Sequence, residues 1–207
     1  DGPNIDFANT YEGERSFVDF LNYINGNKEI KLSQISYIFE KKYYNISHRT
    51  FPQGDDLNVI PDFGNLKLDR LTDLGEIGTF RYWRPKNSKG AAVLSNKGCR
   101  ARCSFCSVRN FNGKGVRAKS INTVVDEIQE LKEKYGITHV TWLDDDLFFD
   151  KQRTIDLFNE ITKRNLKITW DASNGLIASA AVAHPELVSA AEESGCIGAY
   201  FGIESGN

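Results

Sequence analysis

The chain has 207 residues with 28 acidic and 26 basic side chains, and its formal net charge of −2 excludes a general attraction to nucleic acids and other polyanions. Hydrophobic residues make up 40% of the sequence and charged residues 26%, which excludes a disordered chain and predicts that all of it folds. Apolar runs are short and separated by charges, which excludes a membrane span and a secretory signal and predicts a cytoplasmic protein.

Residues 1–28 have the pattern of the end of an α/β unit. A strand is expected over residues 4–9, and a turn over 12–14 follows it. A helix is expected next, because apolar side chains recur at helical spacing at Phe17, Phe20, Leu21 and Ile24. The pattern therefore predicts the tail of a domain.

The regular spacing of apolar residues weakens over residues 29–89. Apolar and aromatic residues at 35–39 and 43–50 predict a small hairpin. The segment 51–80 is rich in Gly, Pro and Asp, which are typical of turns and loops. We therefore expect residues 29–89 to connect two domains.

From residue 90 onward, short apolar runs alternate with longer runs whose apolar residues recur at helical spacing. Strands are expected at 91–95, 139–143, 167–171 and 197–203, and helices at 121–135, at 151–164 and from 184. Ser120 is placed to cap the first helix, and Gly136 to end it. The order βαβαβαβ predicts an α/β fold in which one parallel sheet is joined by right-handed helical crossovers.

Polar or reactive residues follow each of these strands. A loop with three cysteines follows the first strand, Asp144 to Asp146 follow the second, Ser173 with Asn174 the third, and Glu204 with Ser205 the fourth. Ligands of parallel sheets bind at the carboxyl ends of the strands. We therefore expect four strand ends to converge on one site.

The cysteine loop has the spacing C-x3-C-x2-C at Cys99, Cys103 and Cys106. Three clustered thiolates can hold a cubane 4Fe-4S cluster through three of its irons and leave the fourth iron open. The alternative is a zinc site that Cys196 or a histidine completes. Zinc sites commonly pair two short-spaced cysteine motifs, and the second motif is missing here. Cys196 precedes a buried strand, where packing is its default role.

With an aromatic residue before its last cysteine, this loop resembles the signature of the radical S-adenosylmethionine (radical SAM) superfamily. The flanking segments 95–99 and 115–120 are also similar to that superfamily. The resemblance implies a partial (β/α)6 barrel of about four βα units over residues 90–207. It further implies a 4Fe-4S cluster, S-adenosylmethionine cleaved to a 5'-deoxyadenosyl radical, a small-molecule substrate, and an electron donor such as flavodoxin or ferredoxin.

The resemblance assigns two aspartates to S-adenosylmethionine. Asp145 and Asp146 open the run Asp-Asp-Leu-Phe, which is similar to a motif after the second strand of radical SAM enzymes fused to cobalamin-binding domains. In the superfamily this strand end helps hold the amino group of the cofactor. The alternative is a solvated turn of carboxylates that caps the helix from residue 151.

Four further residues are assigned to the cofactor by the same resemblance. Ser173 follows the third strand, and Glu204 with Ser205 is expected to contact the ribose or methionine part. A simple exit from a strand into a turn would use similar residues. Phe105 is expected to lie beside the adenine, and its alternative role is to fill the core.

The front of the chain resembles a narrower group. Residues 6–14, with the helix from Ser16, are similar to the last strand and helix of a Rossmann-like cobalamin-binding domain, with Tyr11 in place of the first Gly of its turn. Residues 59–63 resemble the linker that leads into the radical SAM barrel. The resemblance implies cobalamin as a third cofactor and methyl transfer or a related C–H functionalisation. No histidine stands in the context of an axial cobalt ligand, and His48, His139 and His184 are expected at the surface or at caps.

Two rivals share parts of this pattern. A methylthiotransferase has the same cysteine loop but a leading domain with its own cluster cysteines, and no cysteine precedes Cys99. A non-catalytic module held by a four-cysteine zinc site is the rival of another class. The sequence contains no methionine, so we expect it to be a piece of a longer protein and to be inactive alone.

Overall fold

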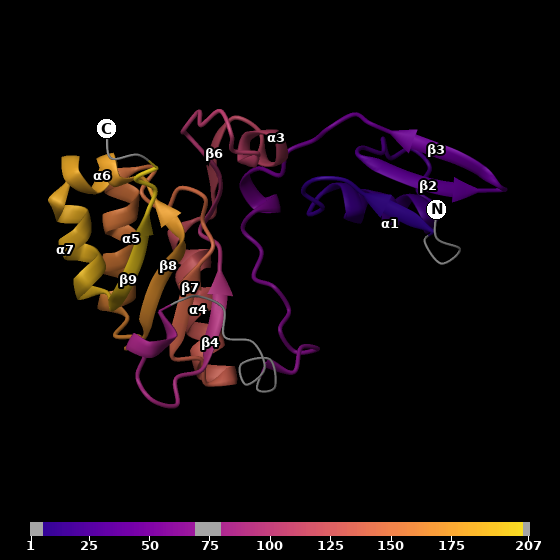
Figure 1. The fold of residues 1–207 in the computed structure, drawn as a ribbon. Coiled ribbons are helices and arrows are strands. Elements are labelled where there is room, and N and C mark those ends of the chain that lie inside the picture. The colour runs from indigo at the N-terminus through magenta and orange to yellow at the C-terminus, as the bar shows by residue number, and fades with distance from the viewer. Residues whose placement is uncertain (1–5, 69–79, 205–207) are drawn as a thin grey trace.

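The computed structural model describes residues 6–68 and 80–204 (Figure 1). A small N-terminal unit contains β1 (Phe7–Asn9), α1 (Ser16–Ile24), β2 (Ile35–Phe39) and β3 (Lys42–Ile46). These strands form an antiparallel sheet in the order β1-β2-β3. The hairpin expected in the connection thus shares a sheet with the first strand. The assignment of residues 1–28 to a separate domain stays a prediction.

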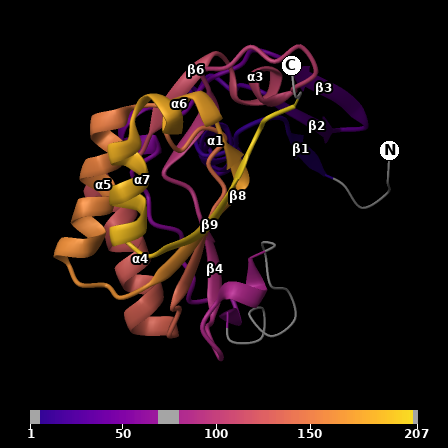
Figure 2. The same ribbon diagram turned by 60° about the vertical axis from the view of Figure 1, so that its left-hand side comes forward.

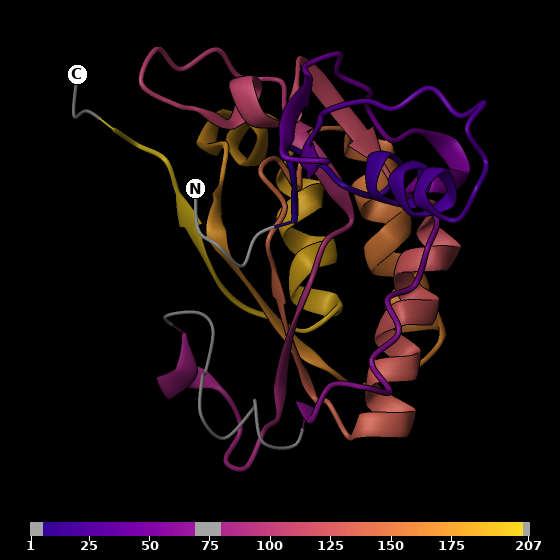
Figure 3. The same ribbon diagram turned by 90° about the vertical axis from the view of Figure 1, so that its right-hand side faces the viewer.

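The larger unit is built on four parallel strands. They are β4 (Gly90–Val93), β7 (His139–Trp142), β8 (Thr169–Leu176) and β9 (Cys196–Phe201), hydrogen-bonded in the order β4-β7-β8-β9. Helices α4 (Ile121–Tyr135), α5 (Lys151–Lys163) and α7 (Pro185–Glu193) lie together on one face of this sheet (Figures 2 and 3). The predicted α/β fold with a parallel sheet is confirmed.

The helix ends follow the expected local chemistry. The Ser120 side chain accepts a hydrogen bond from the backbone N–H of Thr123 at 3.1 Å and caps α4. Gly136 adopts a left-handed conformation with φ of 69°, which ends the same helix. Asp150 caps α5 by accepting from the N–H of Arg153 at 3.0 Å. None of the helices in the described ranges is long and apolar enough to cross a membrane.

The core of the larger unit lies between the sheet and its helices. Trp142 and Trp170 point to the helix side and are 1% and 0% exposed. The ring of Phe158 from α5 stacks on Trp170 with a centroid distance of 4.9 Å. Side chains alternate along a strand, so the residues next to these tryptophans in β7 and β8 face the other side of the sheet.

The other face of the sheet carries a buried polar cluster around Asp171. One of its oxygens, Oδ2, lies 2.9 Å from Nε2 of His139 and 3.2 Å from Nη2 of Arg84. His139 is fully buried, so the expectation that it lies at the surface or at a cap is wrong. The reason is its register: it pairs with Thr169 and therefore faces inward beside Asp171.

Several elements were not expected from the sequence. The stretch after β4 forms an antiparallel ribbon of β5 (Asn96–Cys99) and β6 (Gly115–Ala118), with α3 (Val108–Asn112) between them. Further additions are α6 (Ala178–Ala183) and two short 3-10 turns, η1 (Gly54–Asp56) and η2 (Arg81–Trp83). Strand β8 continues through an irregularity to Leu176 instead of ending at residue 171. Ser173 therefore lies within this strand.

Candidate functional site

The ribbon with α3 lies beyond the carboxyl ends of the parallel strands (Figure 1), and the three clustered cysteines fall between the end of β5 and the start of α3. Cys99 ends β5 and is partly buried, whereas Cys103 and Cys106 lie on the exposed loop before α3. A turn joins the latter two, since the N–H of Cys106 donates to the carbonyl of Cys103 at 3.2 Å. All four cysteines of the chain are free thiols.

Cys103 and Cys106 open into a polar hollow of about 450 Å³. Its other lining residues are Arg102, Ser104, Arg109, Asn110 and Lys114. Cys99 does not line this hollow, and the described residues contain no group of three His, Cys, Asp or Glu side chains that would meet around a single metal ion. A cubane cluster binds each thiolate at a different iron, so its ligands need not meet at one point. Three free thiols within one short loop are the donor set that a 4Fe-4S cluster needs.

The surroundings of Cys99 favour its neutral thiol form over the thiolate. Burial raises the pKa of Cys99, and the charges of Asp146, Asp145 and Cys103 raise it further. A hydrogen bond from the N–H of Ala101 lowers the pKa but does not outweigh these effects. Thiols bind iron as thiolates. Cluster binding at Cys99 therefore requires release of a proton.

Three consecutive aspartates fasten the ribbon to the end of β7. Asp144 accepts from the N–H of Ser95, at 3.2 Å through Oδ1 and at 3.0 Å through Oδ2. Asp145 accepts from Asn112 at 2.7 Å and from the N–H of Gly98 at 3.3 Å. Asp144 thus holds the residue before β5, and Asp145 holds both β5 and α3.

Asp146 makes the most buried of these attachments. Its side chain is 0% exposed, and Oδ2 lies 3.0 Å from Nε of Arg100, next to Cys99. Oδ1 is buried and has no hydrogen-bond partner among the described residues. Burial raises the pKa of Asp146, and the charge of Arg100 opposes this effect. Because Asp144 and Asp146 are buried and Asp150 caps α5, the alternative of a solvated capping turn is wrong.

Burial of Asp144 gives a prediction about pH. Burial raises the pKa of Asp144 from 3.8 to about 6, although hydrogen bonds from Ser95 and the charge of Arg153 oppose it. Between these values the folded chain keeps a proton that the unfolded chain has lost, so the free energy of unfolding falls as the pH rises from about 4 to about 6. In Asp144→Asn this fall should be smaller by on the order of 2 kcal/mol.

Urea unfolding of both proteins at pH 4, 5, 6 and 7 measures this difference. The asparagine can still accept from the N–H of Ser95, so the comparison isolates the ionisation of the carboxyl group. Parallel pH profiles for the two proteins would contradict the raised pKa.

The other expected cofactor residues occupy different settings. Phe105 is 72% exposed, so its ring does not fill the core. The hydroxyl of Ser173 donates to Oδ1 of Asp171 at 2.5 Å. Glu204 is exposed and adopts a left-handed φ of 60°. Ser205 lies outside the described residues.

Asn174, which the sequence places at the end of the third strand, connects two strand ends. Its Nδ2 donates to the carbonyls of Leu143 and Asp144 at 3.1 and 3.2 Å, so it joins the ends of β7 and β8. Arg100 was missed, although its side chain reaches Asp146 and the carbonyls of Phe148 and Phe149. Arg100 occupies a variable position of the cysteine motif, so the spacing of the motif did not indicate its contact with Asp146.

The sequence profile of the family described as the Radical SAM superfamily matches residues 93–207. These residues include the whole ribbon, the aspartates and all but the first part of the parallel sheet. The chain belongs to the radical SAM superfamily. An uncharacterised methyltransferase of Pyrococcus horikoshii is 29% identical over 204 residues, which cover 98% of this chain and 41% of the relative.

Solved radical SAM structures share the fold. The methyltransferase TsrM from Kitasatospora setae, with cobalamin and a 4Fe-4S cluster bound, matches 97% of this chain and 38% of its own, with a TM-score of 0.63 and 16% identity. The cobalamin-dependent radical enzyme OxsB, with aqua-cobalamin and S-adenosylmethionine bound, matches 95% of this chain and 27% of its own, with a TM-score of 0.66 and 20% identity. This chain therefore spans less than half the length of these proteins.

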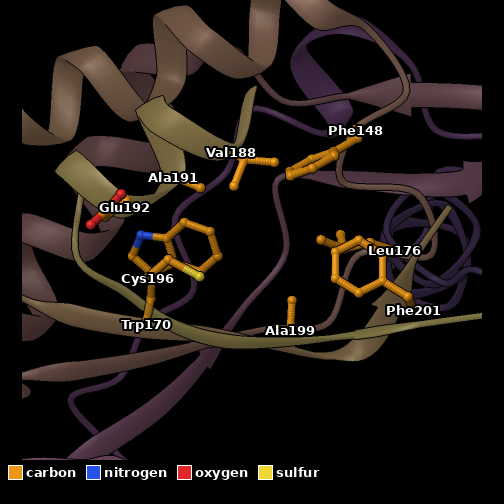
Figure 4. Close-up of a pocket in the computed structure, with 9 residues that line it drawn as sticks. All are labelled: Phe148, Trp170, Leu176, Val188, Ala191, Glu192, Cys196, Ala199 and Phe201. Atoms are coloured by element: carbon orange, nitrogen blue, oxygen red, sulfur yellow. The ribbon is translucent and has the colours of Figure 1, made fainter. Parts of the chain in front are cut away.

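The fourth cysteine of this radical SAM chain lies in another pocket (Figure 4). Cys196 begins β9 and faces an apolar pocket of about 400 Å³ between α7 and the strands β8 and β9. Burial raises the pKa of Cys196 to about 11. The cysteines of the ribbon do not line this pocket, which argues against a zinc site made by all four thiols.

The N-terminal unit contacts the cysteine ribbon through a stack of aromatic and basic side chains. The guanidinium of Arg49 lies between the rings of Tyr11 and Phe51, 3.9 and 4.4 Å from their centroids. It also donates to the carbonyl of Asn110 in α3 at 2.8 Å. A Cβ atom added to Gly113 would lie 2.5 Å from the Phe51 ring.

Gly113→Ala should therefore destabilise the protein more than Gly115→Ala. Both glycines have a positive φ, of 80° and 82°, so alanine is strained at both positions. The Cβ of the second variant meets nothing within 4 Å, whereas that of the first displaces a ring held between Arg49 and Arg117. We expect an additional loss of about 1–3 kcal/mol for Gly113→Ala in denaturant unfolding. Equal losses in the two variants would show that the Phe51 contact is unimportant.

Proposed function

We propose that the longer protein is a cobalamin-dependent radical SAM enzyme that transfers a methyl group or carries out a related C–H functionalisation on a small molecule. The observation that carries the proposal is the ribbon with three free thiols beyond the carboxyl ends of a parallel sheet. Membership of the superfamily, the methyltransferase relative and the two cobalamin-binding neighbours support it.

In this proposal Cys99, Cys103 and Cys106 hold a 4Fe-4S cluster. The chemistry that a bound cluster supplies is one electron, which cleaves S-adenosylmethionine to methionine and a 5'-deoxyadenosyl radical. The aspartates Asp144 to Asp146 keep the ribbon at the end of β7, where they fasten it at three points. The three thiols that would hold the cluster are thereby kept next to the carboxyl end of β7.

The expected cofactor contacts divide into two groups by their surroundings. Phe105 and Glu204 are exposed and free to contact S-adenosylmethionine. Asp145, Asp146 and Ser173 already bond to protein groups, so we propose that they act on the cofactor from these fixed positions. Ser205 completes the set in the proposal.

Residues 1–28 are proposed to be the tail of a Rossmann-like cobalamin-binding domain, 29–89 a connection, and 90–207 the first part of the radical SAM core. The free thiols support a reducing compartment such as the cytoplasm. An electron-donor protein such as flavodoxin or ferredoxin is the proposed partner.

Anaerobic reconstitution with iron and sulfide tests the proposal. We expect about four irons and four sulfides per chain, with the broad brown absorbance of a 4Fe-4S cluster. In the longer protein, dithionite and S-adenosylmethionine should then yield 5'-deoxyadenosine, measured by chromatography. A colourless protein that holds one zinc ion would contradict the proposal.

A further inference from the structure

Asp171 is the centre of a hydrogen-bond network on the face of the sheet opposite the helices. Its Oδ2 lies 2.9 Å from Nε2 of His139, 3.2 Å from Nη2 of Arg84 and 3.3 Å from Oγ1 of Thr141. The side chains of Asp171 and His139 are 0% exposed, and that of Arg84 is 4% exposed. A buried ion pair usually stabilises a fold no more than apolar side chains of similar volume do. Folding stability alone therefore does not account for this carboxylate.

The second oxygen of Asp171 binds a residue of the expected cofactor set. Its Oδ1 accepts from the hydroxyl of Ser173 at 2.5 Å. The guanidinium of Arg84 beside it is always charged, and an ionised carboxylate can accept hydrogen bonds but cannot donate one. The single hydroxyl proton of Ser173 is therefore directed at Asp171.

This bond determines what Ser173 can offer to a ligand. A hydroxyl group has one proton and two lone pairs. The proton of Ser173 is used by Asp171, and no donor among the described residues is bonded to its Oγ. The residue is partly exposed, which leaves room for a ligand. Ser173 can thus accept a hydrogen bond from a ligand but has no proton to donate to one.

Ser173 lies at the end of the sheet that carries the cysteine ribbon. The next residue, Asn174, donates to the carbonyls of Leu143 and Asp144 and so holds this part of β8 beside the end of β7. Asp144 accepts in turn from the N–H of Ser95, the residue before β5, at 3.0 Å. The free lone pairs of Ser173 are therefore placed where the proposed cofactor binds.

Resting on the proposed function, we propose that Asp171 is a positioning residue that makes the Ser173 hydroxyl an acceptor for S-adenosylmethionine. The amino group and the ribose hydroxyls of this cofactor can donate hydrogen bonds, whereas its carboxylate can only accept them. Ser173 is thereby assigned to one of the donor groups and not to the carboxylate. Asp171 itself does not touch the cofactor, since its two oxygens are bonded to protein groups.

Equilibrium dialysis of two ligands against the anaerobically reconstituted longer protein tests this assignment. Ser173→Ala should weaken binding of S-adenosylmethionine by about tenfold, because the cofactor loses one acceptor. Binding of decarboxylated S-adenosylmethionine should weaken by the same factor, since this analogue keeps the amino group and the ribose hydroxyls and lacks only the carboxylate.

Two further serine variants are the controls. Ser173→Thr keeps the hydroxyl at a strand position that a β-branched residue suits, and should bind both ligands like the original protein. Ser189→Ala removes an exposed hydroxyl from α7 and should leave both dissociation constants within about twofold of the original values.

Asp171→Asn tests the positioning role. The amide oxygen has to face the donors Arg84 and His139, so the amide nitrogen faces Ser173 and donates to it. The hydroxyl proton of Ser173 then points at the donor group of the cofactor, and binding should weaken by about tenfold. Adding Ser173→Ala to this variant should change the affinity by less than about twofold, because both changes remove the same interaction. Circular dichroism at the assay temperature verifies that each variant is folded.

Three results would overturn the proposal. The first is an affinity for S-adenosylmethionine that Ser173→Ala leaves unchanged. The second is a loss for S-adenosylmethionine without a loss for the decarboxylated analogue, which would mean that Ser173 donates to the carboxylate. The third is full additivity of Asp171→Asn and Ser173→Ala, which would mean that Asp171 has a structural role only.

An analogue without the amino group identifies the donor. If the effect of Ser173→Ala disappears with this analogue, the amino group is the donor to Ser173, and if the effect persists, a ribose hydroxyl is the donor. Failure of the original protein to take up iron or to bind S-adenosylmethionine is seen before any variant is compared. That failure contradicts the proposed function, whereas the three results above contradict only the roles of Asp171 and Ser173.

Discussion

Replacing Cys103 with alanine is expected to reduce the iron content of the reconstituted chain from about four atoms to near background. The cluster needs three thiolates, and no other cysteine of the ribbon can replace the missing one. Iron and sulfide assays, with the visible absorbance of the anaerobic protein, measure the loss.

Cys196→Ala is the matched control for this prediction. Cys196 is the one cysteine outside the ribbon, and it lies in the apolar pocket between α7 and the strands β8 and β9 (Figure 4). Its loss should leave the iron content unchanged. If Cys196→Ala removed iron as completely as Cys103→Ala, a site made by three thiolates would be wrong.

Asp171→Ala is expected to cost about 3–5 kcal/mol of folding stability, which is the usual effect of removing one partner from a buried ion pair. The Asp171 carboxylate is 0% exposed and accepts from Arg84, His139 and Ser173. Burial raises its pKa, but the hydrogen bonds from His139 and Ser173 and the charges of His139 and Arg84 outweigh this and hold the pKa of Asp171 below its usual value. The ionised carboxylate is therefore the centre of the cluster.

The control for this prediction is Asp126→Ala. Asp126 also forms an ion pair with an arginine, Arg164, but its side chain is 51% exposed. Exposed pairs contribute up to about 1 kcal/mol, so this change should shift the urea midpoint only slightly. Similar losses in the two variants would show that burial of Asp171 adds nothing to its importance.

The alternating core of the larger unit could be predicted because its signals are local. Helix α4 was predicted at residues 121–135, where the structure has it, since apolar spacing, the Ser120 cap and Gly136 all lie within a few residues of one another. The parallel sheet followed from the alternation of strands and helices. Each of these inferences needed only neighbouring residues.

The ribbon and the polar clusters could not be predicted because their partners are distant in sequence. Strands β5 and β6 are short and rich in glycine and basic residues, so neither shows the alternation of a half-buried strand. The pairing of Asp146 with Arg100 and of His139 with Asp171 depends on strand register, which no local pattern specifies. The cluster ligands and cofactor contacts stay predictions.

Glu12 bonds to both strands of the ribbon at once. Its carboxylate lies 3.9 Å from Nζ of Lys97 in β5 and 2.8 Å from Nη2 of Arg117 in β6, and Gln34 donates to its carbonyl. A rotation of the N-terminal unit is therefore transmitted to the two strands together. The position of the N-terminal unit and the position of the cysteine ribbon are thus coupled mechanically through one buried carboxylate.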